Sequence, residues 1–176
     1  MKFKELLLRS KSYLDKNPHY VANRYSLGVF WWGAKWMFDR LDELDKKKGH
    51  SFDSSVNFTA YGIFKYILCA GTLLLSAIFL FGVSPFLLPF SIIAFYIVEV
   101  HFLFLFPLLI DKVKYPLLIS IKQTYRIGLF KAIFTIMPIG FFMVVGLFHW
   151  RKPLLNWHIG CLSVLLWYQD EVRARL

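Results

Sequence analysis

The fold is decided by residues 61–110, which read YGIFKYILCAGTLLLSAIFLFGVSPFLLPFSIIAFYIVEVHFLFLFPLLI. This stretch of 50 residues contains one lysine, one glutamate and one histidine, at positions 65, 99 and 101, and no other Lys, Arg, Asp, Glu or His. A helix needs about 20 apolar residues to cross the hydrocarbon core of a bilayer. The link Gly82-Val83-Ser84-Pro85 divides the stretch in two, so it predicts two membrane-spanning helices joined by a tight turn.

The composition of the whole chain agrees with an integral membrane protein. The residues A, V, I, L, M, F, W, Y and C make up 57% of the 176 positions, against about 45–50% in an ordinary soluble domain. The formal net charge is +10, but we find no recognisable nucleic-acid-binding module, so we expect no nucleic-acid partner. We interpret the positive charge as a cytoplasmic surface that faces anionic lipids.

Four apolar runs predict an all-α, polytopic bundle of four transmembrane helices. We place the spans at about 61–83, 86–110, 127–148 and 151–168. The fourth run is short, and it reaches a full span if Arg151 and Lys152 snorkel outward and Trp150 lies at the interface. A three-span chain with a re-entrant last run is the main alternative.

The chain is expected to have two parts. Residues 54–176 form the membrane domain, and residues 1–53 form cytoplasmic, amphipathic helices at the membrane interface. With four spans, 17 Lys and Arg residues fall on one side of the membrane and 2 on the other. The positive-inside rule then places both termini in the cytoplasm of a multi-pass protein of the cell membrane, which we expect to be an inner membrane. A second interfacial helix is expected over 115–126, between the second and third spans.

The interfacial region is predicted from apolar residues at helical spacing between Leu27 and Leu44. Tryptophan-rich apolar faces beside charged faces are typical of helices that lie in the headgroup layer. An alternative is packing of the same face on the protein's own bundle or on a partner. The residues expected to contact the membrane surface are Trp31, Trp32, Trp36 and Phe38.

Two ionisable residues inside the second span are candidates for catalysis. An ionisable group within a membrane span is costly and is by default a functional hypothesis. Glu99 lies 11 residues from Ile110, which corresponds to a depth of about 17 Å. Its role is open between a proton, cation or substrate site and a structural bond to a hydroxyl or to Lys131. His101 is turned about 200° away around the helix, so the two cannot share one narrow face.

The cytoplasmic rim carries charged residues at several expected helix ends. We expect Asp111, Lys131, Asp170 and Glu171 to bind a substrate or a lipid headgroup. With Asp53 these carboxylates have the oxygen ligands that a hard divalent ion and a phosphate-bearing substrate would need, and the alternative is a belt of salt bridges that fixes the helix ends. Their spacing matches no phosphotransfer motif, so we assign no metal ligands. Lys65 and Lys131, each about one turn inside its helix, are expected to snorkel to the interface.

Three functions follow from these residues, and the sequence does not decide whether the chain is an enzyme. One is a small enzyme that acts on a lipid or isoprenoid at the cytoplasmic interface, with Glu99 or His101 as acid or base. A second is a non-catalytic subunit or scaffold of a larger complex, and a third is a proton-coupled transporter or channel that uses Glu99. Membrane lipids are expected partners in each, and a protein partner or a second copy is compatible with each. The sequence identifies no cofactor.

Overall fold

The computed structural model describes residues 2–21, 28–45, 51–149 and 152–176, and every regular element within them is helical. The expected start of the stripe at Leu27 and of the fourth span at Arg151 lie outside the described residues. The α-helices are α1 (Phe3–Lys16), α2 (Val29–Asp45), α3 (Phe58–Val83), α4 (Ser91–His101), α5 (Leu105–Ile110), α6 (Pro116–Ile127), α7 (Leu129–Leu147) and α8 (Leu155–Trp167). Short 3₁₀ turns cover Pro18–Tyr20, Pro85–Phe90 and Arg173–Arg175, and a π-turn covers Tyr168–Val172.

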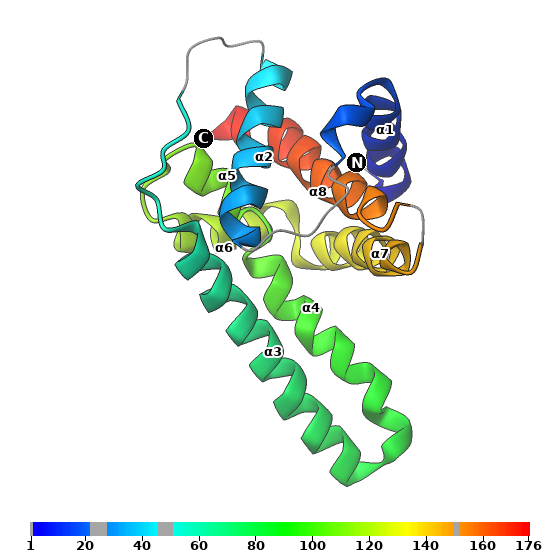
Figure 1. Ribbon diagram of the computed structural model, residues 1–176. Coiled ribbons are helices and arrows are strands. Elements are labelled where there is room, and N and C mark those ends of the chain that lie inside the picture. The colour runs from blue at the N-terminus through cyan, green and yellow to red at the C-terminus, as the bar shows by residue number, and fades with distance from the viewer. Residues whose placement is uncertain (1, 22–27, 46–50, 150–151) are drawn as a thin grey trace.

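Helices α3 and α4 form a long hairpin that projects from the other helices (Figure 1). The side chain of Asn57 caps α3 by accepting a bond from the Ala60 amide at 3.0 Å. At the other end, α3 stops at Val83, just before Ser84 and Pro85, because the residue before a proline is disfavoured in the helical region. The turn at Pro85–Phe90 then returns the chain along α3 as α4.

The prediction of membrane-length helices is confirmed for the first three apolar runs. Three helical segments are long and apolar enough to cross a membrane, namely Phe58–Val83, Pro85–Ile110 and Leu129–Leu147. Their exposed side chains are largely apolar, which fits a membrane protein. The predicted all-α fold is therefore confirmed, whereas the count of four spans is not.

The fourth apolar run forms α8, which is buried inside the protein. Its 13 residues extend only about 20 Å, less than the thickness of a bilayer core of about 30 Å. Figure 1 shows α8 between α1 and α7, and both helices contact it. Its buried side chains are those of Ile159, Leu162, Ser163, Leu165, Leu166 and Trp167. The apolar character of this run is thus explained by packing against other helices.

The amino-terminal helices share the core with α8. Leu6 and Leu14 of α1 and Leu41 of α2 are at most 2% exposed, and they belong to the same apolar cluster as Trp167 and Tyr168. The described helices of the amino-terminal part and those of the membrane domain therefore pack together over one core. An interfacial position of the amino-terminal helices is not confirmed by this arrangement.

The second apolar run is interrupted at Phe102–Phe104, between α4 and α5. The break leaves carbonyl groups near the end of α4 without partners in their own helix, and side chains of α6 donate hydrogen bonds to them. The hydroxyl of Thr124 donates to the carbonyl of Val100 at 2.7 Å, and the hydroxyl of Ser120 donates to the carbonyl of His101 at 2.8 Å. Polar groups removed from water need such partners, so α6 turns a polar face toward the protein interior.

We expect the Thr124→Val substitution to destabilise the protein by about 1–3 kcal/mol, because it leaves a buried carbonyl with one bond fewer. The free energy of unfolding, measured by SDS titration in mixed micelles, checks this. Thr72→Val is the matched control, since the Thr72 hydroxyl bonds only to the Leu68 carbonyl of its own helix at 2.9 Å. Equal losses in the two variants would contradict this role of α6.

Candidate functional site

The two charges within the hairpin meet each other. The ammonium group of Lys65 on α3 lies 2.7 Å from a carboxylate oxygen of Glu99 on α4, and their side chains are only 6% and 14% exposed. The thiol of Cys69, one turn after Lys65, lies 3.6 Å from the other oxygen of Glu99. Residues four apart on a helix share a face, so α3 presents both donors to α4.

This ion pair accounts for the presence of Glu99 in an apolar run. Each charge is costly to bury alone, and each is the nearest counterion of the other. The expectation that Lys65 reaches water is wrong, because its side chain is buried toward α4. The alternative partner Lys131 is also not the partner of Glu99, since it contacts Glu171 instead.

Glu99 is also closer to a helix end than we expected. The depth of about 17 Å assumed one continuous helix as far as Ile110. The structure ends α4 at His101, two residues after Glu99, because the chain turns at Phe102–Phe104. The pair therefore lies near the base of the hairpin.

His101 is directed away from Glu99, as the helical spacing predicted. Its Nδ1 bonds to the Ile97 carbonyl one turn earlier, and its Nε2 lies 3.2 Å from the hydroxyl of Tyr125 on α6. Glu99 faces α3 and His101 faces α6, so the two candidate catalytic residues are not brought together. A catalytic role for either residue stays a prediction.

The carboxylates of the rim each have a cation of their own. Asp111 accepts bonds from the Tyr168 hydroxyl at 2.6 Å and from Arg173 at 2.8 Å. The three other pairs are Asp170 with Arg9 at 2.7 Å, Glu171 with Lys131 at 2.8 Å, and Asp53 with Lys112 at 3.0 Å. This arrangement is a belt of separate salt bridges that connects helix ends. Among the described residues, no group of three His, Cys, Asp or Glu side chains is placed to hold a metal ion.

The tryptophan-rich helix α2 directs most of its aromatic side chains toward the protein. Trp36 donates its indole N–H to the Tyr20 carbonyl at 2.9 Å, and Trp31 and Phe38 pack against Phe52. Trp32 is 55% exposed. Contact of these residues with a membrane surface stays a prediction.

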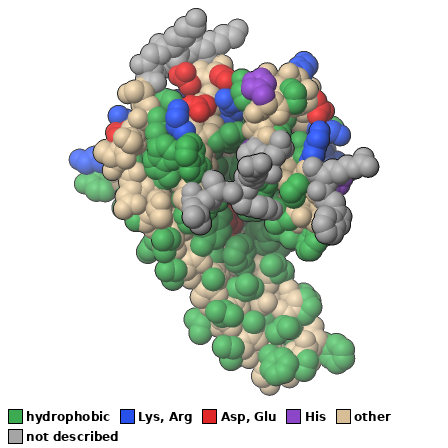
Figure 2. Space-filling view, in the orientation of Figure 1, with side chains coloured by type: hydrophobic (Ala, Val, Ile, Leu, Met, Phe, Trp, Pro, Cys, Tyr) green, Lys and Arg blue, Asp and Glu red, His purple; other side chains and the backbone are tan. Residues whose placement is uncertain are grey.

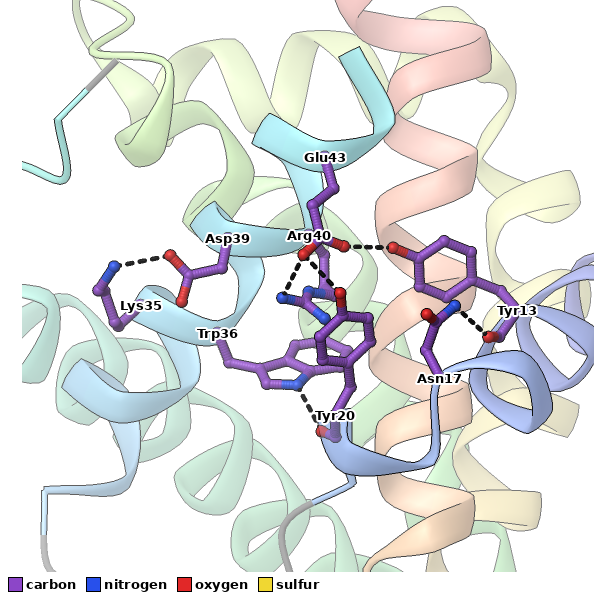
Figure 3. A network of polar contacts seen from close by, with 8 residues as sticks. All are labelled: Tyr13, Asn17, Tyr20, Lys35, Trp36, Asp39, Arg40 and Glu43. Carbon is purple, nitrogen blue, oxygen red and sulfur yellow. Dashed lines mark hydrogen bonds and ion pairs between the residues drawn. The ribbon is translucent and has the colours of Figure 1, made fainter. Parts of the chain in front are cut away.

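A polar network that we did not predict fixes α1 to α2 (Figure 3). Glu43 accepts bonds from the hydroxyls of Tyr13 and Tyr20 at 2.5 and 2.7 Å, and from Arg40 at 2.9 Å. Arg40 is only 5% exposed, and its guanidinium stacks on the ring of Tyr20. Burial and its hydrogen bond to Glu43 raise the pKa of Tyr13, and the separate hydrogen bond of Tyr20 to Glu43 raises the pKa of Tyr20. The i, i+3 spacing of Arg40 and Glu43 was the only signal in the sequence.

An open cavity of about 380 Å³ lies where α5, α6 and the start of α3 meet. Its polar lining comes from Asp53, Asn57, Tyr61 and Lys112. Hydrogen bonds from Ser55 and the contact with Lys112 lower the pKa of Asp53 to about 2, so this carboxylate is ionised at neutral pH. Glu99 is not among the residues that line the cavity.

Comparison of the chain with protein-family models, with curated proteins and with solved structures finds no match. The role of the site is therefore argued from its geometry.

The pair of Glu171 and Lys131 predicts a pH dependence of stability. Burial raises the pKa of Glu171, but hydrogen bonds and positive charges, those of Lys131 among them, lower it, and the folded pKa lies below the ordinary value of 4.5. A carboxyl group with a lowered folded pKa stabilises the protein above its unfolded pKa. We therefore expect the free energy of unfolding to fall as the pH decreases below about 4.5.

The contribution of this pair is measured by the slope of unfolding free energy against pH between pH 5 and 3. Glu171→Gln should make the slope shallower, and Lys131→Gln should have a smaller effect in the same direction because it removes one cause of the lowered pKa. A wild-type slope in Glu171→Gln would show that another group is responsible.

Proposed function

We propose that this protein is a non-catalytic membrane subunit or scaffold. In this proposal the α3–α4 hairpin crosses the bilayer, and the remaining helices form a head on the cytoplasmic side. The single observation that carries it is the buried contact of Lys65 with Glu99, which uses the carboxylate that a catalytic or transport role would need to be available.

The length of the hairpin matches the hydrocarbon core. The 20 steps from Ile63 to Val83 extend about 30 Å, which is about the thickness of a bilayer core. Large apolar side chains are exposed along this whole length. On α3 they are Ile63, Phe64, Ile67, Leu68, Leu74, Leu75, Ile78, Phe79, Phe81 and Val83.

Charge is confined to the base of the hairpin and the head. Residues 66–98 are 33 consecutive positions without Lys, Arg, Asp, Glu or His. Figure 2 shows the charged side chains gathered over the head and an apolar surface along the hairpin. At the tip, Phe86 is 90% exposed. Such a surface is suited to lipid and not to water.

The contact between α1 and α8 supports two crossings in place of four. The hydroxyl of Ser163 donates to that of Ser10 at 2.9 Å, and Arg9 pairs with Asp170, so the two terminal segments lie on one side of any membrane. Helices α7 and α8 must then either both cross the membrane or both remain on the side of the two terminal segments. Helix α1 packs against α8, and the opposite face of α1 exposes Lys4 and Lys11. Because these charges would be costly in hydrocarbon, we assign α7 and α8 to the head.

In this arrangement α7 lies against the bilayer surface by one apolar face. Its most exposed side chains are spaced along one side of the helix, and its opposite side packs on α4 and α8. The exposed set on α7 is Phe130, Phe134, Phe141, Val144 and Val145, and Phe148 follows directly after the helix. The head contains nearly all of the 21 Lys and Arg residues, so the positive-inside rule favours its cytoplasmic location.

The two-crossing topology is tested by labelling added cysteines with a membrane-impermeant maleimide in sealed vesicles. The variants are Ser12→Cys on α1, Lys152→Cys before α8 and Phe86→Cys at the tip, and all three positions are at the surface of the protein. The unmodified chain, with Cys69 and Cys161, gives the background. We expect positions 12 and 152 to label from the same side, and position 86 not to label from that side.

The control is detergent permeabilisation, after which every exposed cysteine should react. Labelling of position 152 only from the side opposite to position 12 would contradict two crossings and would favour the four spans predicted from the sequence.

The non-catalytic role is tested with the K65M/E99Q variant, which removes both charges and keeps side chains of similar size. The protein is solubilised from its native membrane in mild detergent and analysed by size-exclusion chromatography. We expect it to elute as an assembly larger than one chain, with or without the two substitutions. In proteoliposomes, neither protein should dissipate an imposed pH gradient. Elution as a single chain, or a proton flux lost on substitution, would contradict a scaffold role and favour the enzyme or the transporter.

A further inference from the structure

The corner between α5 and α6 and the exposed face of α6 form a basic and aromatic surface. Residues 112–126 contain four cations, Lys112, Lys114, Lys122 and Arg126, and no Asp or Glu. All four are exposed in the structure. We propose that this surface, named here the α6 surface, binds the phosphate groups of anionic phospholipids at the base of the hairpin.

The buried face of α6 fixes which side chains point outward. Ser120 and Thr124 are fully buried because their hydroxyls bond to the last carbonyls of α4. A helix held by one face presents the opposite face to its surroundings. The residues on that outer face are Tyr115, Leu118, Lys122, Tyr125 and Arg126.

The α6 surface lies at the level where the apolar hairpin begins. Tyr125 contacts His101, the last residue of α4, and Figure 1 shows α6 at the base of the hairpin. If the hairpin crosses the bilayer, α6 lies in the headgroup layer. Tyrosine is enriched at this level in membrane proteins, because its ring is apolar and its hydroxyl is polar.

Three of the four cations of the α6 surface differ from those of the rim, whereas Lys112 pairs with Asp53 at 3.0 Å. Arg9, Lys131 and Arg173 each contact a carboxylate. Within the described part of the chain, Lys114, Lys122 and Arg126 have no carboxylate within 4.0 Å. Cations without a protein counterion attract the anionic groups of lipids.

The segment that joins α5 to α6 has two residues with uncommon backbone angles, and it lies beside the open cavity. Lys112 and Tyr115 adopt positive φ angles of 54° and 58°, which are uncommon for residues other than glycine. Such positions cluster at ligand-binding sites, where the surrounding structure maintains them. The cavity of about 380 Å³ opens here, lined by Asn57, Pro116 and the ion pair of Lys112 with Asp53. Because Asp53 is ionised, the phosphate is expected on the side of Lys114, Lys122 and Arg126, and the cavity adjoins that position.

The inference rests on the proposed membrane insertion of the hairpin, so insertion is measured first. If sodium carbonate extracts the full-length protein from membranes, the proposed function is overturned. Protein that resists extraction is then purified in a neutral maltoside detergent and titrated with phosphatidylglycerol or with phosphatidylcholine. Native mass spectrometry counts the bound lipids.

We compare two variants that each remove three positive charges. K114Q/K122Q/R126Q changes the α6 surface, and K4Q/K11Q/K16Q changes exposed positions of α1, away from the hairpin. Each Lys or Arg near an anionic surface contributes about fivefold to binding, so the first variant should bind phosphatidylglycerol on the order of 100-fold more weakly. The α1 variant should stay within about twofold of the unmodified protein. Circular dichroism confirms that both variants are folded.

Two results would overturn the inference while the proposed function stands. One is equal binding of phosphatidylglycerol by the two variants. The other is equal binding of phosphatidylcholine and phosphatidylglycerol by the unmodified protein. In a third arm, a large excess of inorganic phosphate is added, and it should not displace the lipid. Complete displacement would identify a site for the free anion instead of a lipid headgroup.

Discussion

A charge cannot remain unpaired in hydrocarbon, and the contact of Lys65 with Glu99 meets this constraint within the hairpin. The two residues are the only Lys, Arg, Asp or Glu between positions 54 and 110, and 33 uncharged residues separate them along the chain. The fold brings them to 2.7 Å because α3 and α4 run antiparallel from one tight turn. The contact thereby fixes which residues of α3 lie opposite which residues of α4.

The rest of the structure follows from the base of this hairpin. Helix α4 ends two residues after Glu99, and the chain turns back through α5 to α6. The hydroxyls of α6 satisfy the last carbonyls of α4, and the outer face of α6 is left with its lysines and tyrosines. Helices α7 and α8 then pack with α1 and α2, which are joined by the bonds of Glu43 to Tyr13 and Tyr20. The hairpin is apolar on its outside, and the charged side chains are gathered on the other helices.

The sequence predicted the hairpin well and α8 poorly, and both outcomes have one cause. An apolar run reports that its side chains avoid water, but it does not report whether lipid or protein surrounds them. In α3 the runs of Leu, Ile and Phe are exposed on the protein surface, whereas Leu162 and Leu165 of α8 are completely buried. The length of the fourth run was the signal in the sequence that it does not cross a membrane, since it is shorter than a bilayer core requires.

The sequence drew attention to Glu99, but it did not predict the contacts of this residue. The separation of Glu99 from His101 followed from helix geometry alone. The partner of Glu99 did not, because pairing between helices depends on how they pack. The sequence suggested a hydroxyl or Lys131, whereas the partner is Lys65. The network of Glu43 with Tyr13 and Tyr20 also depends on packing between segments that are 23 to 30 residues apart.

The most direct test of the central claim is a double-mutant cycle on the ion pair, measured as unfolding free energy in mixed micelles. Lys65→Met and Glu99→Gln should each destabilise the protein by about 3–5 kcal/mol, and the double variant should recover much of that loss. The exposed pair of Lys35 and Asp39, 2.6 Å apart on α2, is the control and should couple by less than about 1 kcal/mol. Additive losses at positions 65 and 99 would contradict the claim that the two charges stabilise the hairpin through each other.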